Sequence, residues 1–424
     1  MSEWKHETVR ALCSHVIDCR NKTAPVVNYP TPYKMLRTSN IRNGFVDISS
    51  VRYVTKQTYD IWTSRGELED GDVIFTREAP LGEVGILRTA DGYFLGQRLV
   101  LFRSNPQKCY NWFLNYALLS PWIKNKICGS GGGSIVTHLR VPDCEEIQIR
   151  IPADLSEQRR IADTLRAIDE KIELNQQIND NLEAMAQALY DYWFVQFDFP
   201  DENGKPYKSS GGKMVWNEVL KREIPEGWSA QPLFDVASVL YGYPFKTELF
   251  TEESSDLPII RIRDILENTF SAYSREPVHE KYLTHKGDLL IGMDGNFHLN
   301  YWHRDGDGVN QRVVRIRSSA PTVSNIQLKL ELTPYIKMRE ANVTRSTVGH
   351  LSDKDFKERY ILVAAESVAF NPAKVLDALL DRITSLVAER QKLSKQRDFL
   401  LPLLMNGQVQ VKPQGGLNYH LADD

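Results

Sequence analysis

The second half of the chain repeats the first, and this duplication constrains the fold more than any other feature of the sequence. The matching segments are residues 4 and 228, 71–75 and 287–291, 96–104 and 310–318, and 134–139 and 346–351, at offsets of 224, 216, 214 and 212. The segments keep their order while the offset shrinks slightly, as a few loop deletions in one copy produce. The pattern therefore predicts two similar globular domains in one chain.

Each copy has the pattern of a small α+β domain. Short β-branched and aromatic stretches, such as residues 73–75 and 99–102, lie between Gly-Asp or Asp-Gly turns and predict strands. A helical segment from about Trp112 to Ile127 follows in the first copy, and Pro121 is expected to interrupt it. About 150 residues per copy are enough to bury a hydrophobic core.

After each copy, the apolar residues alternate by three and four, as in a long amphipathic helix. The apolar positions of this seam are Leu165, Ile168, Ile172, Leu182 and Leu189 after the first copy, and Leu376, Leu379, Ile383, Leu386, Leu393 and Leu400 after the second. Polar residues also occupy the seam, namely Asn175, Asn179, Arg390 and Arg397. Polar seam residues cost stability but fix register, so we expect the two helices to pair as an antiparallel coiled coil.

Capping residues set the expected boundaries. Asp154 or Ser156 begins the first long helix, Asn371 and Pro372 begin the second, and Gly407 ends it. The predicted divisions are residues 1–154 and 229–365 for the globular domains, 155–197 and 366–407 for the helices, 198–228 for a polar linker and 408–424 for the tail. The predicted fold class is α+β, with two tandem domains separated by two paired long helices.

Composition narrows the class of protein. The 424 residues are 42% hydrophobic and 25% charged, which is typical of a globular protein. We expect a cytoplasmic protein, because the chain has no run of about 18 apolar residues and its N-terminus lacks the apolar segment of a signal peptide. The net charge of −3 disfavours nucleic-acid binding through bulk charge, so any such binding must rest on local basic surfaces. The five cysteines lack metal-site spacing and predict reduced, mostly buried thiols.

No catalytic or metal-binding motif stands out. The glycine-rich segment 129–134 lacks the lysine of a phosphate-binding loop, and residues 305–308 depart from a calcium loop at Val309, which favours a hairpin turn. His298 and His303 could bind a metal with nearby aspartates, but histidines in such Asp-Gly-rich segments are usually surface residues. We therefore expect no catalytic residue, no metal and no cofactor in this chain.

Polar side chains that suit base recognition recur in both copies. Arginine suits guanine, Asn and Gln suit adenine, and Ser and Thr suit phosphates. The candidate DNA-binding residues are Arg37, Asn40, Gln97, Arg98, Thr137 and His138 in the first copy, and Arg261, Arg263, Gln311, Arg312, Arg345, Thr347 and His350 in the second. Because duplication preserves structural residues too, the same positions can equally be half-exposed strand residues.

Several motifs resemble those of the specificity subunit of type I restriction–modification enzymes, and the resemblance covers essentially the whole chain. Residues 225–228 (Pro-Glu-Gly-Trp) resemble the opening of a target-recognition domain, and residues 346–351 resemble its closing loop. Residues 155–161 and 192–200 resemble the motifs that begin and end the central helix. The chain departs from the pattern at Trp4, which no Pro-Glu-Gly precedes, and at the start of the second helix.

The resemblance implies a non-catalytic subunit in which each domain reads one half of a split DNA target through the major groove. The paired helices then act as a ruler, since the seam from Leu165 to Trp193 spans about 42 Å at 1.5 Å per residue. That length corresponds to roughly 12 base pairs at 3.4 Å each. Two rival functions remain open at this point, a coiled-coil adaptor that binds only proteins and a self-contained DNA-modifying enzyme.

The resemblance also implies partners. Two methylation subunits, which bind S-adenosylmethionine and methylate adenine, are expected to dock on helix faces that include Tyr192 and Trp193. In the family, two motor subunits, which use ATP and magnesium, complete a complex that cleaves unmethylated DNA, and the resemblance implies such partners here. All of these cofactors are expected on the partners and none on this chain.

Overall fold

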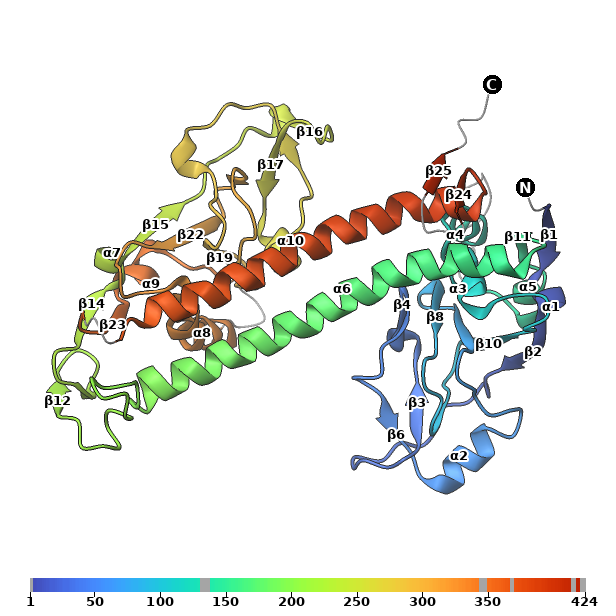
Figure 1. The fold of residues 1–424 in the computed structure, drawn as a ribbon, viewed down its shortest axis with the longest axis horizontal. Helices are drawn as coiled ribbons and strands as arrows, with labels where there is room; N and C mark the ends of the chain where they lie inside the picture. Colours follow the sequence, from blue (N-terminus) through green and yellow to red (C-terminus); the bar gives the residue numbers. More distant parts are fainter. Residues whose placement is uncertain (1–2, 130–137, 343–348, 367–369, 413–416, 420–424) are drawn as a thin grey trace. The chain divides into compact units, whose positions relative to one another are not determined.

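The computed structural model describes residues 3–129, 138–342, 349–366, 370–412 and 417–419. The chain divides into two compact units, of which unit 1 contains residues 1–171 and 393–424 and unit 2 contains residues 172–392. Each unit holds one copy of the repeat together with parts of both long helices (Figure 1).

Unit 1 is built on a six-stranded sheet with the strand order β2-β10-β7-β8-β5-β4. Its strands are β2 (Cys13–Asp18), β4 (Ile41–Arg42), β5 (Gly44–Val46), β7 (Val73–Arg77), β8 (Leu81–Ile86) and β10 (Leu99–Ser104). A three-stranded sheet contains β6 (Arg52–Tyr53), β3 (Lys34–Leu36) and β9 (Tyr93–Leu95), and the short helices are α1 (Val9–Leu12), α2 (Lys56–Trp62) and α5 (Val141–Glu145).

The central strands of this sheet are apolar on both faces. On β7, Val73 and Phe75 pack into one core cluster, while Ile74 packs into another. On β10, Phe102 packs into the cluster of Val73 and Phe75, while Leu101 packs into the cluster of Ile74. A strand buried on both sides needs continuous apolar residues, which explains why these stretches show no polar alternation.

Unit 2 repeats this plan. Its four-stranded sheet has the order β15-β22-β19-β20, which matches β2-β10-β7-β8 strand for strand. The strands are β15 (Ala237–Tyr241), β19 (Leu289–Gly292), β20 (Leu299–Tyr301) and β22 (Val313–Ser318), and a second sheet contains β16 (Phe250–Thr251), β17 (Leu257–Ile260), β18 (Tyr273–Ser274) and β21 (Gly308–Val309). The short helices are α7 (Leu233–Val236) and α9 (Asp353–Lys357). The duplication seen in the sequence is therefore a duplication of the fold.

In each copy the first and last strands lie side by side. In unit 1, β1 (Trp4–Thr8) pairs antiparallel with β11 (Gln148–Pro152). In unit 2, β14 (Ser229–Pro232) pairs antiparallel with β23 (Tyr360–Val363). The chain therefore enters and leaves each repeated domain at the same place.

Both copies carry a helix after their central strands. In unit 1, α3 (Asn111–Leu119) and α4 (Pro121–Cys128) are separate helices, as the position of Pro121 predicted, because a proline cannot continue a helix but fits its first turn. In unit 2, the sequence analysis predicted no counterpart, yet α8 (Asn325–Ala341) occupies the equivalent place and continues through Pro334.

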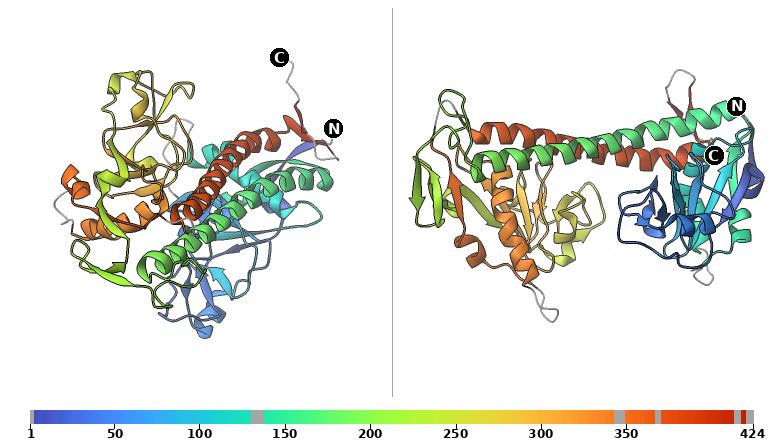
Figure 2. Two further views of the ribbon diagram at one scale, coloured as in Figure 1. Left: turned by 60° about the vertical axis from the view of Figure 1, so that its left-hand side comes forward. Right: turned by 90° about the horizontal axis from the view of Figure 1, so that it is seen from below.

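Two long helices follow the repeated domains, namely α6 (Leu155–Tyr190), with 36 residues, and α10 (Pro372–Met405), with 34 residues (Figures 1 and 2). Their predicted caps are present. The Ser156 amide donates to Asp154 Oδ1 at 2.9 Å, and the Lys374 amide donates to Asn371 Oδ1 at 3.3 Å. Gly407 follows α10 with a φ of 76°, a left-handed conformation that favours glycine.

Contacts join the two long helices within each unit. In unit 1, Arg397 of α10 donates to Asp169 of α6 at 3.1 Å. In unit 2, Asn179 donates to the Ile383 carbonyl at 3.3 Å, while Asn175 donates to Glu389 at 3.0 Å. The buried members of the predicted seam are Leu165, Leu376, Ile383, Leu386 and Leu400, and the half-buried ones are Ile168, Ile172, Leu182, Leu189, Leu379 and Leu393.

The segment after α6, expected as a polar linker from residue 198, is folded onto unit 2. A short π-helical stretch (Asp191–Val195) leads into it, and strands β12 (Met214–Asn217) and β13 (Arg222–Pro225) form a hairpin. Phe199 and Trp228 stack with ring centroids 4.7 Å apart, and both are buried. In unit 1, β24 (Val409–Val411) and β25 (Leu417–Tyr419) pair within the predicted tail.

Four cysteines, Cys13, Cys19, Cys109 and Cys144, are free and buried, as predicted for these positions. Burial raises the pKa of Cys13 and Cys144 to about 12, so neither thiol ionises near neutral pH. Among the described residues, no helix has both the length and the apolar character that crossing a membrane requires.

Candidate nucleic-acid interface

In both copies, a parallel strand pair brings the predicted arginines together. Strand β3 pairs with β9 in unit 1, and the Gly96 amide donates to the Leu36 carbonyl at 2.8 Å, which sets Arg37 beside residues 97–98. Strand β17 pairs with β21 in unit 2, and the Asn310 amide donates to the Ile260 carbonyl at 3.2 Å. Arg261 therefore lies beside residues 311–312.

In unit 2, several of these side chains line one hollow of about 450 Å³. The lining residues are Arg261, Ile262, Arg263, Asp294, Asn296, His298, Asn310, Arg312 and Val313. Three predicted DNA-binding arginines thus share a single concave site. Burial, together with repulsion from Arg263, lowers the pKa of Arg261, so the cationic groups here are crowded. Such a site suits an electronegative partner.

An acidic residue that was not among the predicted DNA-binding residues contacts the predicted arginine and histidine in each copy. In unit 2, Asp294 contacts Arg312 Nε at 3.2 Å and His350 Nδ1 at 2.6 Å. In unit 1, Glu78 lies 3.4 Å from Arg98 Nε and 3.6 Å from His138 Nδ1. The signal was present in the sequence, since Glu78 and Asp294 are related by the same offset of 216 as the preceding strands.

Asn40 is structural, and we withdraw it from the candidate DNA-binding residues. Its side chain is fully buried in the turn that follows β3. Its Oδ1 accepts from the Arg37 amide at 2.9 Å, while its Nδ2 donates to the Asp47 carbonyl at 2.8 Å and to Ser50 Oγ at 3.1 Å. In the second copy, Asp264 accepts from the Arg261 amide at 2.9 Å in the same way. The recurrence of this position reflects a shared turn.

The remaining candidate DNA-binding residues differ in the solvent exposure of their side chains and in their hydrogen bonds to the protein. Arg37 donates to the Ser50 carbonyl at 2.6 Å and Arg261 donates to Ser271 Oγ at 3.0 Å, so both guanidinium groups are anchored to their own domain. The exposed or half-exposed candidates are Gln97, Arg98, His138, Arg263, Gln311, Arg312 and His350. Thr137, Arg345 and Thr347 lie outside the described residues.

The two aromatic residues expected to contact partners have different surroundings. Trp193 is only 6% exposed and packs edge-on against Phe370 with ring centroids 5.1 Å apart. Trp193 therefore belongs to the core of unit 2, and we withdraw it as a partner contact. Tyr192, beside it, is 37% exposed and stays a predicted contact.

The histidines considered as metal ligands make other contacts. His298 Nδ1 lies 3.1 Å from the Ile262 carbonyl, and the buried His303 lies 3.0 Å from the Asn268 side chain. Over the described part of the chain, no group of three or more His, Cys, Asp or Glu side chains gathers at metal-binding distance. Asp307 accepts from Trp302 Nε1 at 2.8 Å, and the segment 305–308 links β20 to β21, which do not pair with each other, so the predicted hairpin turn is wrong.

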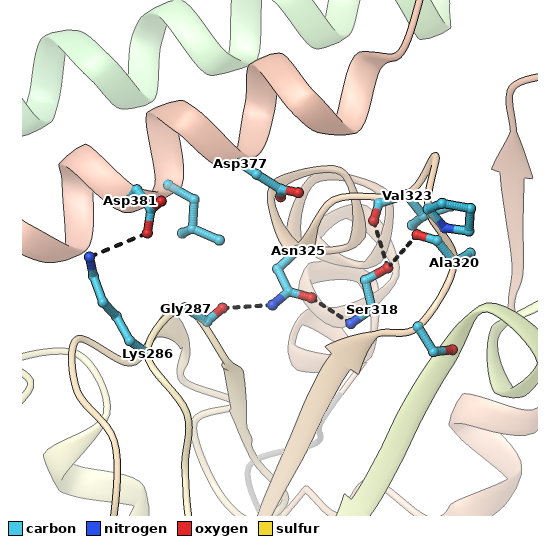
Figure 3. Close-up of a pocket in the computed structure, with 11 residues that line it drawn as sticks. Lys286, Gly287, Ser318, Ala320, Val323, Asn325, Asp377 and Asp381 are labelled. Atoms are coloured by element: carbon cyan, nitrogen blue, oxygen red, sulfur yellow. Dashed lines mark hydrogen bonds and ion pairs between the residues drawn. The ribbon is translucent and has the colours of Figure 1, made fainter. Parts of the chain in front are cut away.

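A second hollow of unit 2, of about 430 Å³, lies beside α10 and is part of the scaffold (Figure 3). Asn325 Nδ2 donates to the Gly287 carbonyl at 2.7 Å and its Oδ1 accepts from the Ser318 amide at 2.7 Å, which ties α8 to β19 and β22. Lys286 pairs with Asp381 of α10 at 3.3 Å. None of the predicted DNA-binding residues that the structure describes lines this hollow.

Comparison with known proteins shows which proteins this chain resembles. Residues 25–184, which include most of the first long helix and most of the first repeat, match the family model of the type I restriction modification DNA specificity domain. Over this range the chain is similar to the specificity subunits of type I restriction–modification enzymes. Specificity subunits of these systems are non-catalytic.

Two relatives match over most of their length. The MjaIX specificity subunit of Methanocaldococcus jannaschii is 24% identical over 353 residues, which cover 81% of this chain and 78% of the relative. The HindI specificity subunit of Haemophilus influenzae is 21% identical, with 96% and 100% covered. The crystal structure of a type I system S subunit from M. genitalium has a similar fold, with a TM-score of 0.54, 18% identity, and coverage of 95% and 96%.

Proposed function

We propose that this chain is the specificity subunit of a type I restriction–modification system and reads a bipartite DNA target, one half with each repeated domain. The observation that carries the proposal is the recurrence of the same cationic site in both copies. Arg98 directly precedes β10, Arg312 directly precedes β22, and each shares an acidic neighbour with a histidine of its own copy. Two equivalent sites in one chain suit two separate half-targets.

The side-chain chemistry supports base reading. The terminal nitrogens of arginine match O6 and N7 of guanine in the major groove, and glutamine matches adenine. Gln97 with Arg98, and Gln311 with Arg312, supply such pairs at solvent-accessible positions. In unit 2, three arginines line one hollow, so a local basic surface is available for DNA contact although the net charge of the chain is −3.

We further propose that α6 and α10 pair along their length as an antiparallel coiled coil and set the gap between the two half-targets. The contacts within unit 2 support this direction, since residue numbers rise along α6 from Asn175 to Asn179 while the partner residues fall from Glu389 to Ile383. A helix of 36 residues extends about 54 Å at 1.5 Å per residue, enough to span more than one turn of DNA.

The remaining activities belong to partners in this proposal. Methylation subunits that carry S-adenosylmethionine dock on the helices, and motor subunits that use ATP and magnesium join them where cleavage occurs. The MjaIX and HindI relatives are named as specificity subunits of type I restriction enzymes, which supports such an assembly. Partners that enclose the duplex also supply part of the phosphate neutralisation.

The test is a long-read map of adenine methylation in cells that express this chain with its methylation subunit. The expected result is one split motif that disappears when the chain is omitted. Exchanging residues 229–365 for those of a relative is expected to change one half of the motif and leave the other half and the spacing intact.

Other outcomes favour the rival functions. Methylation that occurs but ignores the identity of the chain contradicts DNA reading and favours a protein adaptor. Methyl transfer or cleavage by the purified chain alone contradicts a non-catalytic role and favours a self-contained enzyme. A control with both repeats intact but the methylation subunit inactivated establishes that the signal comes from the complex.

A further inference from the structure

We propose that Glu78 and Asp294 are positioning residues that hold the reading arginine and histidine of their copy in one orientation toward a DNA base edge. This inference rests on the proposed function and deepens it. It assigns a specificity-determining role to two carboxylates that do not themselves suit contact with DNA, because a carboxylate is repelled by phosphates.

Three segments distant in sequence build the same cluster in both copies. The acidic residue follows β7 in unit 1 and β19 in unit 2. The arginine immediately precedes β10 in unit 1 and β22 in unit 2, and the histidine lies just before α5 or α9, respectively. The backbones of Glu78 and His138, and those of Asp294 and His350, also form equivalent antiparallel bridges. The equivalent strands and bridges therefore bring the acidic residue, the arginine and the histidine together in both copies.

The acidic charge is kept between the copies while the side-chain length is not, since one copy has Glu and the other has Asp. A contribution to folding stability does not explain why both copies keep an acidic residue here. The arginine side chains are 49% and 55% exposed and the histidines are both 48% exposed. Ion pairs this open to solvent contribute little to folding because water and salt screen them.

A structural ion pair in the same two sheets provides the contrast. Arg103 pairs with Asp72 at 2.9 Å, and its counterpart Arg317 pairs with Asp288 at 2.6 Å. Both aspartates are 1% exposed. Those buried carboxylates hold strands together, whereas Glu78 and Asp294 act at the surface where the readers lie.

The geometry of the contact leaves the reading end of the arginine available. The closest approach of each carboxylate is to Nε, the inner nitrogen, at 3.4 Å in Arg98 and 3.2 Å in Arg312. The terminal Nη1 and Nη2 can then donate together to O6 and N7 of a guanine. Arg98 also has a φ of 69°, a left-handed backbone conformation that is uncommon outside glycine and costs energy, as is typical of residues held for function.

The test uses the full-length chain with its methylation subunit and compares Glu78→Gln and Asp294→Asn with the natural protein. Each variant removes the charge and keeps the size. Glu78→Gln is expected to reduce discrimination at one base of the first half-target by on the order of tenfold, and Asp294→Asn to do so only in the second half. Discrimination is measured as the ratio of methylation at the cognate motif to that at each single-base variant.

Two control variants remove a carboxylate of the same domain away from the cluster. Glu83→Gln breaks the Lys124 pair, whose atoms are 2.9 Å apart, and Asp256→Asn breaks the Arg275 pair at 3.2 Å. Both are expected to leave the discrimination ratios unchanged. Glu78→Asp, which retains the charge, is expected to retain most of the discrimination.

A double variant separates positioning from folding. If Glu78 acts through Arg98, the Arg98→Ala variant loses discrimination at the same base, and Glu78→Gln adds nothing to that loss. Unchanged ratios in Glu78→Gln, or a uniform loss at every base with the same thermal stability, overturn the inference. Failure of the proposed function is a different result, because the natural protein itself then shows no motif that depends on the chain.

Discussion

Arg397 reaches the buried carboxylate of Asp169 at 3.1 Å, and the same carboxylate accepts from the Tyr116 hydroxyl at 2.7 Å. Asp169 is 2% exposed, and burial raises its pKa despite both partners. The contact joins the two long helices to α3 within unit 1. A buried carboxylate without a cationic partner costs several kcal/mol of folding free energy. Loss of Arg397 from this ion pair is therefore expected to destabilise the fold, although the surrounding seam residues are apolar.

Replacing Arg397 with methionine is therefore expected to lower the free energy of unfolding by about 3 kcal/mol, since Asp169 is left buried without a cation. Urea unfolding of the purified chain measures the loss. The matched control is Lys56→Met, which breaks an exposed pair with Asp60 at 2.8 Å and is expected to leave the free energy of unfolding nearly unchanged, because water screens the pair. Equal losses in the two variants contradict the assignment.

Asn179→Leu is expected to stabilise the chain by about 1 kcal/mol. The side chain is 4% exposed and its Oδ1 has no protein partner among the described residues. Removing a buried acceptor without a partner recovers its desolvation cost, and Ile383 keeps the helical bond of its carbonyl. Thermal unfolding of the purified chain measures the gain. A large loss of stability instead shows that the asparagine fixes the register of the helix pair.

Glu331 predicts a pH dependence of stability. Its carboxylate accepts from Gln327 at 2.8 Å and from the Leu362 amide at 3.1 Å, yet burial raises its pKa from 4.5 to about 7. The unfolded chain therefore releases this proton at lower pH than the folded chain, so the contribution of Glu331 to stability is full below pH 4.5 and is lost as pH rises to about 7. The natural protein is expected to lose thermal stability across this window. Glu331→Gln is expected to flatten the loss, and a parallel decline in the variant rules Glu331 out.

Arg312→Ala is expected to relax one base position in the second half of the DNA target and to cost about 1–3 kcal/mol in binding by the assembled complex. Competition binding with oligonucleotides that vary one base at a time measures both effects. Arg98→Ala serves as the matched variant, because its effect is expected in the first half. If either change weakens binding to all sequences equally, that arginine contacts phosphate.

Tyr192→Ala and Trp193→Ala separate assembly from folding. Tyr192 is 37% exposed, so its replacement is expected to weaken association with the methylation subunit while thermal stability stays within about 0.5 kcal/mol. Trp193 is 6% exposed and its truncation is expected to cost about 3–5 kcal/mol in stability. Analytical ultracentrifugation and thermal unfolding give the two readouts, and a normal complex with Tyr192→Ala contradicts a contact there.

Local patterns predicted the elements that depend on local chemistry. The helix caps at Asp154 and Asn371, the break at Pro121 and the end at Gly407 were correct because each depends on a few neighbouring residues. The helix α8 was missed because Pro334 lies inside it, and packing against the sheet overrode the proline signal.

Predictions that depend on distant contacts failed for a physical reason. Asn40 has the side chain of a base reader, but bonds to Asp47 and Ser50 enclose it. Trp193 was predicted to lie on an exposed helix face, but Phe370, which is distant in sequence, packs against it. Glu78 was overlooked because nothing in its own segment shows that an arginine and a histidine meet there.

The pairing of β14 with β23 has a consequence for how such genes change. Because the two ends of the second repeat are neighbours in one short ladder, an incoming stretch of coding sequence with breakpoints in these strands replaces the repeat between a fixed entry and a fixed exit. The incoming stretch must keep the apolar residues that pack against the long helices, such as Leu289 and Ile291. If the second repeat reads one half-target as proposed, a lineage can acquire a new half-target by recombination in a single event, whereas point mutation has to alter individual side chains one at a time.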